Sequence, residues 1–202
     1  MSSIVIKPKI LYFGTPVALI TTVQADGSAN ISPMSSAWAL DDRIVLGLGE
    51  RGQCMANLRR LGECVINLPD ASLWLQVEAL AGTTGSSPVP RYKQEMGYRH
   101  EPDKFALAKL TRQTSQLVTP PRIAECPLQL EARVVAMHPC GDDPDDGTVI
   151  VETQVVRVHA HADIVVPDTQ YIDTDAWSPL LYVFRHYFGH AKRLGRNARA
   201  EA

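Results

Sequence analysis

The sequence predicts a mainly β protein with short helices. Runs of β-branched and other apolar residues recur along the 202-residue chain, and turn-forming residues separate them. Segments in which apolar residues have helical spacing are few and short. The predicted strands are Val17–Val23, Ile31–Ala39, Ile44–Leu48, Cys64–Leu68, Leu128–Met137 and Thr148–His159.

Tight turns join the first three predicted strands. The Asp-Gly pair at 26–27 favours a turn, because glycine tolerates the positive φ that such a turn needs, and the Asp pair at 41–42 leads into the third strand. Pro33 has no backbone N–H, so we expect the second strand at a sheet edge or with a bulge. Residues 35–37 are small, and their backbone can approach a planar ligand. A solvent-exposed bulge explains the same residues.

A glycine-containing loop and a short helix follow the third strand. Gly49–Gly52 forms the loop, Cys54–Leu61 has helical spacing, and Gly62 can end the helix in the left-handed region. A helix start offers free N–H groups and suits a phosphate, and Arg51 adds a permanent charge. The alternative is an ordinary strand–turn–helix unit whose glycines serve only the turn. Cys54, at the helix start, is either a thiol of lowered pKa or a packed side chain.

Composition limits the function classes. Hydrophobic residues make up 45% of the chain, charged residues 21%, and the net charge is −2, so no global positive field attracts nucleic acid or anionic membranes. No apolar run approaches the ~20 residues of a membrane span, and the first residues lack the apolar stretch of a signal peptide. We expect a cytoplasmic protein with no nucleic-acid or membrane partner, and one domain over residues 1–202 with a frayed C-terminal tail. The four cysteines form no C-x-x-C pair and are expected to be reduced.

The middle of the chain is predicted to hold a helix over residues 71–82, followed by a long loop at 83–103. Loops of that length are functional lids or variable, solvent-exposed segments. Residues 83–85 are candidates for holding a phosphate, and residues 91–93 for the entrance of a nicotinamide dinucleotide. Asp103 is expected to cap a further short helix.

The last two predicted strands flank a turn rich in Gly, Asp and Pro at 140–147, which is typical of an antiparallel hairpin. That acidic turn lacks the ligand spacing of a calcium loop. His159 and His161 share a strand face but have no visible third ligand. His186 and His190 would share a helix face but lack the glutamate of the H-E-x-x-H zinc motif. No metal site is therefore predicted.

Several motifs, in this order and spacing, resemble the flavin reductase-like family, whose members bind FMN on a split β-barrel. The resemblance covers roughly residues 12–160, with a looser match at Tyr187–His190. It implies a split β-barrel of the FMN-binding flavin reductase type. The matching stretches are PVALITT (16–22), Asn30, Pro33 and Ser35-Ser36, IVLGLGERG (44–52), Asn57–Arg60, GECVINLP (62–69), Asp103-Lys104-Phe105 and residues 121–135.

The resemblance also implies which residues bind the cofactor. The phosphate would be held by Arg51, the backbone of residues 53–55 and Asn57, and the flavin ring would accept hydrogen bonds from residues 35–37. Gly52 and Cys54 depart from the family, since hydroxyl side chains usually stand there. The expected cofactor-binding residues are Pro33, Ser35, Ser36, Ala37, Arg51, Gln53, Cys54, Asn57 and Phe105.

The activity that the resemblance implies is NAD(P)H-dependent flavin reduction, with FMN as cofactor and NADH or NADPH as electron donor. The flavin itself carries this hydride chemistry, so we assign no catalytic side chain. The alternative is a non-catalytic or electron-relay FMN protein, like flavoredoxin, that a protein partner reduces. The resemblance further implies a homodimer, for which the apolar helix at 72–81, with Trp74, offers a surface.

Overall fold

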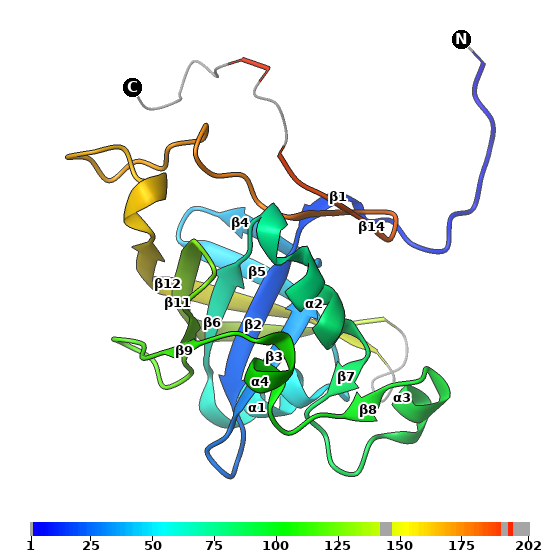
Figure 1. Ribbon diagram of the computed structural model, residues 1–202. Coiled ribbons are helices and arrows are strands. Elements are labelled where there is room, and N and C mark those ends of the chain that lie inside the picture. The colour runs from blue at the N-terminus through cyan, green and yellow to red at the C-terminus, as the bar shows by residue number, and fades with distance from the viewer. Residues whose placement is uncertain (1, 142–146, 191–193, 196–202) are drawn as a thin grey trace.

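The computed structural model describes residues 2–141, 147–190 and 194–195. Its main feature is an antiparallel sheet in which, within these residues, seven strands follow the order β3-β2-β6-β11-β12-β5-β4 (Figure 1). The predicted fold class, mainly β with short helices, is confirmed. The strands of this sheet are β2 (Ala18–Val23), β3 (Ala29–Met34), β4 (Ala37–Leu40), β5 (Arg43–Gly49), β6 (Glu63–Leu68), β11 (Leu128–Cys140) and β12 (Thr148–Ala160).

Smaller elements surround this sheet (Figure 1). A second antiparallel sheet joins β1 (Phe13–Pro16), β13 (Leu181–Val183) and β14 (His186–Phe188). Two short pairs, β7 (Thr83–Thr84) with β8 (Arg99–His100) and β9 (Arg112–Gln113) with β10 (Arg122–Ile123), lie at the periphery. The helices are α1 (Gln53–Leu61), α2 (Trp74–Ala81), α3 (Arg91–Glu95) and α4 (Lys104–Ala108), with 3-10 turns at Ala71–Leu73 and Ala162–Ile164.

Two hydrophobic cores lie on opposite faces of β2. Side chains alternate along a strand, and Ala18 and Ile20 join one core while Leu19 joins the other. The first core holds the apolar face of α1 against the sheet, with Met55 and Leu58 fully buried. The second packs α2 and α4 against the same strand. This double burial explains why apolar residues occupy both faces of the β2 sequence.

The predicted strand Ile31–Ala39 is divided into β3 and β4. It pairs with β2 as far as Met34 and with β5 from Ala37 onward. Ser35 and Ser36 form the break, and the backbone N–H of Gly47 donates to the carbonyl of Ser36 at 2.7 Å. β3 is an edge strand, as Pro33 predicts, because its missing N–H leaves no unpaired ladder position there.

The expected long loop at 83–103 contains β7, α3 and β8, three short elements that the sequence did not indicate. The N–H of Arg99 donates to the carbonyl of Gly82 at 3.1 Å, and that of Glu101 to the carbonyl of Thr84 at 2.9 Å. These bonds close the segment onto its own start. Elements of two to five residues are too short to give a periodic signal in the sequence.

The ends of the chain differ in part from the expectations. β11 and β12 form the predicted hairpin, while the turn residues 142–146 and the tail 196–202 lie outside the described residues. His186 lies in strand β14, not on a helix, because this stretch pairs with β13.

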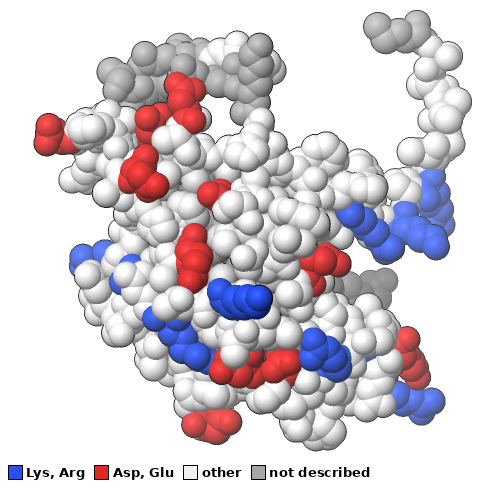
Figure 2. Space-filling model, viewed as in Figure 1, with Lys and Arg blue, Asp and Glu red and all other residues white. Residues whose placement is uncertain are grey.

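In the described part of the chain no helix is long and apolar enough to cross a membrane. On the face shown in Figure 2, acidic and basic residues are mixed over the lower half, whereas only acidic ones lie over the upper left.

Candidate functional site

A cavity of about 390 Å³ lies between the sheet, the start of α1 and the 83–103 segment. Its size falls within the range of small-molecule sites. No Asp or Glu occurs among the described residues that line it, whereas two lysines do. The lining residues are Tyr12, Ser32, Pro33, Met34, Ser35, Ser36, Gly47, Leu48, Gly49, Gly52, Gln53, Cys54, Met55, Ala81, Thr83, Thr84, Gly85, Tyr92, Lys93, Met96, Tyr98 and Lys104.

The start of α1 forms one end of the cavity. Gly52, the N-cap residue, has no side chain to cap the helix, so the first N–H groups of α1 lack intrahelical partners. A Cβ added to Gly52 would lie 3.0 Å from the carbonyl oxygen of Gly49, which is tighter than ordinary packing. The tight turn therefore favours glycine and brings Gln53 and Cys54 to the cavity wall. Free N–H donors and the positive end of the helix dipole suit an anion there.

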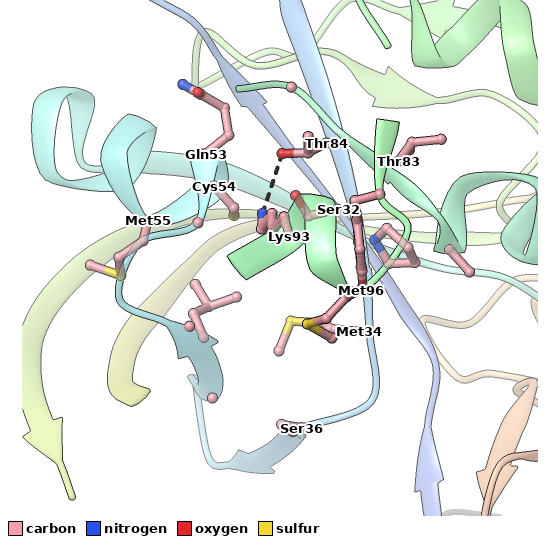
Figure 3. Close-up of a pocket in the computed structure, with 18 of the residues that line it drawn as sticks. Ser32, Met34, Ser36, Gln53, Cys54, Met55, Thr83, Thr84, Lys93 and Met96 are labelled. Atoms are coloured by element: carbon pink, nitrogen blue, oxygen red, sulfur yellow. Dashed lines mark hydrogen bonds between the residues drawn. The ribbon is translucent and has the colours of Figure 1, made fainter. Parts of the chain in front are cut away.

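Two lysines lie near this end. Lys93 donates a hydrogen bond from Nζ to Thr84 Oγ1 at 3.2 Å, which Figure 3 shows near Cys54 and Ser32. Lys104 is only 3% exposed, and its Nζ donates to the carbonyl of Ile31 at 2.8 Å.

Burial shifts the protonation of both lysines. It lowers the pKa of Lys104 to about 8, with the charge of Lys93 as a second cause. Burial also lowers the pKa of Lys93. Desolvated cations are costly without a counter-charge, so this end of the cavity is suited to an anionic group.

A buried acceptor lies beside the lysines. Asn30 Oδ1 has no hydrogen-bond partner, while the Nδ2 of the same side chain donates to Ser32 Oγ at 3.1 Å. Gly85 packs against this amide so closely that a Cβ on Gly85 would lie 2.5 Å from Asn30 Oδ1. An unsatisfied buried acceptor costs about 1–3 kcal/mol. Asn30 itself does not line the cavity, whereas Gly85, which packs on its amide, does.

The other end of the cavity is built by the break between β3 and β4. Tyr12 Oη and Ser36 Oγ are 2.9 Å apart, and the Ser36 carbonyl is fixed by the N–H of Gly47. A Cβ added to Gly47 would lie 2.9 Å from the Cβ of Ser36, so the two segments can approach this closely only because residue 47 is glycine. Together with Met34 this end presents backbone and apolar surface, which suits a planar ring.

Comparison with known proteins identifies the family of the chain. A family model described as a flavin reductase-like domain matches residues 10–191. The chain belongs to the flavin reductase-like family. This membership supports a flavin cofactor in general. A relative from Bacillus subtilis (strain 168), named uncharacterized protein YdfE, is 44% identical over 196 residues, which are 97% of this chain and 93% of that protein.

Solved structures show the same fold. The flavoredoxin of Desulfovibrio vulgaris (Miyazaki F) superposes with a TM-score of 0.78 and 18% identity, over 99% of each chain. A protein with a split barrel domain from Shewanella frigidimarina NCIMB 400 gives a TM-score of 0.70 and 20% identity, over 93% of this chain and 87% of that one. The expected split β-barrel of the flavin reductase type is therefore confirmed.

The structure gathers part of the predicted site around the cavity and leaves part of it elsewhere. Asn57 is buried one turn behind the wall, where its Oδ1 accepts a hydrogen bond from Gln53 Nε2 at 3.0 Å. Phe105 is fully buried in the second core, with the Arg112 guanidinium carbon 4.5 Å from its ring centre. The predicted residues that line the cavity are Pro33, Ser35, Ser36, Gln53 and Cys54, and those that do not are Ala37, Arg51, Asn57 and Phe105.

Arg51 lies at the margin of the cavity. Its side chain is exposed, and its guanidinium carbon is 5.3 Å from the ring centre of Tyr92, which lines the cavity. Stacking of this kind holds the cation beside the opening. The structure thus brings α3 against the loop before α1, an arrangement that no local pattern in either segment indicates.

Several lining residues were missed by sequence reasoning. Lys104 stands next to Phe105 in a family motif, but nothing local indicates that its Nζ points back under β3. Tyr12 and Met34 come from the ends of β-like runs whose facing partners depend on the tertiary fold. The sequence predicts Lys93 at a nicotinamide entrance, and the structure places its Nζ beside Thr84, one of the residues 83–85 that the sequence offers for a phosphate.

The reactive-thiol interpretation of Cys54 is wrong. Burial raises the pKa of its thiol to about 11, and the hydrogen bond with Ser32 and the charges of Lys104 and Lys93 offset only part of that rise. Cys54 is 4% exposed and packs in the first core, so the packing interpretation holds.

The histidines considered for metal have other contacts. His159 Nε2 is 2.7 Å from Glu131 Oε1, and His161 Nε2 is 2.8 Å from the carbonyl oxygen of Ala124. Among the described residues, no three or more His, Cys, Asp or Glu side chains gather as a metal site would require.

Proposed function

We propose that this protein binds FMN in the cavity and reduces it with NADH or NADPH. The observation that carries the proposal is a cavity with two lysines at the start of α1 and no lining carboxylate among the described residues, in a chain of the flavin reductase-like family. FMN combines a phosphate dianion, a hydroxylated chain and a planar ring. The cavity offers a matching environment for each part.

The phosphate is assigned to the end formed by α1, Lys93 and Thr84. Backbone donors carry only partial charge, and a lysine adds a full one. Because Gly52 and Cys54 bring no hydroxyl to this loop, the Thr84 hydroxyl and the Lys93 ammonium group supply side-chain donors beside the free N–H groups of the helix start. Lys104 adds positive potential from beneath β3.

The flavin ring is assigned to the end formed by the β3–β4 break. Ser35 and Ser36 line this end, with Met34 beside them. The hydroxylated chain of FMN would then lie between the two ends, beside Ser32 and Gly85, which line the cavity. This direction for the ligand brings the phosphate dianion to the lysines.

When bound, the flavin supplies the hydride chemistry, and the protein supplies position and electrostatics. The chain therefore needs to hold the ring with one face accessible to a nicotinamide. Tyr92, Tyr98 and Met96 from the 83–103 segment form the wall on the side of α3. Aromatic side chains at this wall give the nicotinamide nucleotide a surface on which to stack.

An electron-relay function fits the same cavity. The flavoredoxin of Desulfovibrio vulgaris shares the fold over 99% of both chains. In that case the chain would hold FMN permanently and take electrons from a protein partner, with no nicotinamide binding.

Nicotinamide oxidation distinguishes the two functions. Purified protein is loaded with FMN, and NADH or NADPH oxidation is followed by absorbance under anaerobic conditions with excess free FMN as acceptor. We expect multiple turnovers with at least one of the two nucleotides. Tight FMN binding without nicotinamide oxidation would favour the relay, and no FMN binding would contradict both functions.

A further inference from the structure

A chain of aromatic rings leads away from the cavity. The ring centres of Tyr12 and Tyr182 are 5.5 Å apart, those of Tyr182 and Tyr187 are also 5.5 Å apart, and Tyr187 and Trp74 follow at 6.3 Å. Each step lies within the distance of directly interacting aromatic pairs. The four rings come from the segment before β1, from β13, from β14 and from α2, so the tertiary fold alone aligns them.

The two ends of this chain lie in different places. Tyr12 lines the proposed flavin cavity, and its hydroxyl is 2.9 Å from Ser36 Oγ. Trp74, at the other end, is 45% exposed and lines a second cavity of about 360 Å³ with Tyr187 and Phe188. The chain therefore connects the interior site with the protein surface.

Tyr187 has a proton acceptor in place. Its hydroxyl donates to Glu78 Oε2 at 3.0 Å. Glu78 lies one helical turn after Trp74 on α2, so the same helix holds the last ring and the base beside the third. Burial, followed by the bond to Glu78, raises the pKa of Tyr187, so the phenol is neutral at physiological pH. A phenol loses an electron more readily when its proton can move to a base at the same time.

We propose that Tyr12, Tyr182, Tyr187 and Trp74 form a path that carries one oxidising equivalent from the flavin cavity to the surface. Tyr12 gives one electron to a one-electron oxidant in the cavity, and its phenol proton passes to the reduced oxidant or to solvent there. Each oxidised ring is then reduced by the next one, in the order Tyr182, Tyr187 and Trp74, and each tyrosine takes back a proton as it is reduced. When Tyr187 is oxidised, its phenol proton moves to Glu78. The proton returns to Tyr187 when Trp74 reduces that ring.

The net reaction is balanced. The oxidant gains one electron, Trp74 loses one, and the indole proton passes to solvent. A thiol or another reducing solute that enters the second cavity, which Trp74 lines, then returns an electron and a proton and restores Trp74. The oxidant belongs to the class of radicals that form when dioxygen meets a reduced flavin, so the path would protect the cavity from oxidation. In this respect the inference rests on the proposed flavin site.

Flash photolysis of the FMN-loaded protein tests the path, because photoexcited flavin is a strong one-electron oxidant. We expect the transient visible absorption of an oxidised tryptophan in the wild type. Trp74→Phe should abolish it. Tyr182→Phe should also abolish it while FMN binding stays normal, since Tyr182 does not line the cavity and Phe keeps the ring but resists oxidation.

The control is Trp38→Phe. Trp38 is 56% exposed and lies outside the ring chain, so its replacement should leave the signal unchanged. Loss of flavin fluorescence is not a sufficient readout, because Tyr92 and Tyr98 also line the cavity and can quench it. An oxidised-tryptophan signal that persists in Trp74→Phe or in Tyr182→Phe, or that never forms in FMN-loaded wild type, would overturn the proposal.

A second arm separates this proposal from the flavin site. In a Cys140→Ser background, Ser35→Cys carries a ruthenium photo-oxidant at the cavity, and no flavin is added. The same dependence on Tyr182 and Trp74 is expected. If FMN does not bind but this arm gives the Trp74 signal, the proposed function fails and the path stands. If FMN binds but neither arm gives the signal, the proposed electron path is contradicted and the proposed flavin site is not.

Discussion

At the scale of single residues, the most informative side chain is Lys104. It is almost fully buried, its Nζ donates to a backbone carbonyl, and the charge of Glu101 offsets only part of the effect of burial and of the Lys93 charge. Burial lowers the pKa of Lys104 from 10.5 to about 8. Between these pH values the unfolded chain holds a proton that the folded chain has lost, so folding stability should rise with pH. Below pH 8 both states are protonated, and the full cost of the buried charge remains.

The rise of folding stability with pH gives a prediction for the protein without ligand. Relative to Lys104→Met, which cannot titrate, the wild type should gain about 2 kcal/mol of unfolding free energy from pH 7.5 to pH 10. Urea unfolding at several pH values measures the difference, and other titrating groups cancel between the two proteins. A difference that does not change with pH would show that Lys104 keeps its ordinary pKa.

At the scale of elements, α1 shows how local signals build part of the site. Gly62 ends this helix with φ 70 and ψ 14, and its N–H donates to the carbonyl of Leu58. A Cβ at Gly62 would meet nothing within 4 Å, so only the left-handed backbone penalises a larger residue. At Gly82 a Cβ would also meet nothing, but φ is −91, which any residue adopts.

These two glycines form a matched pair. Gly62→Ala should lower the free energy of unfolding by about 1–2 kcal/mol, because alanine is strained in the left-handed region. Gly82→Ala should be neutral or stabilise by about 0.4–1 kcal/mol, because it restricts the unfolded chain. Chemical denaturation of both variants tests the pair. Equal effects at the two positions would contradict the role of backbone strain in ending α1.

Some elements can be predicted from the sequence, and others depend on contacts between distant segments. Long periodic or alternating runs, such as those of α1 and β12, can be located because side-chain burial repeats along them. The break at Ser35 and Ser36 cannot be located in this way. The chain changes its strand partner there from β2 to β5, and local sequence does not determine which strands pair. The sequence likewise does not indicate that Lys93 lies beside Thr84, because that contact depends on the pairing of β7 with β8.

At the scale of the whole molecule, we expect a homodimer. Helix α2 exposes Trp74 and Leu75, at 45% and 60%, beside an exposed Phe188. Adjoining exposed apolar side chains of this kind are typical of protein contacts. Light scattering of dilute protein should give twice the chain mass of 22.2 kDa, and Leu75→Arg should weaken the dimer. A wild-type monomer that still binds FMN would contradict this expectation.

The proposed orientation of FMN depends on single residues, on elements and on the fold as a whole. The cavity end at α1 should recognise the phosphate, and the β3–β4 break should recognise the ring. Sequence reasoning assigned the phosphate charge to Arg51, whereas the structure adds Lys93, which lines the cavity and is partly buried. Buried charges interact more strongly than exposed ones, which water and salt screen.

Titration of FMN and riboflavin into wild type, Lys93→Met and Arg51→Ala tests the central claim most directly, since riboflavin lacks only the phosphate. We predict that Lys93→Met weakens FMN about 10- to 150-fold, or about 1.5–3 kcal/mol, and leaves riboflavin unchanged. Arg51→Ala, an exposed cation, should weaken FMN by about 1 kcal/mol or less. Wild type that binds neither ligand, or Lys93→Met that weakens both equally, would contradict the claim.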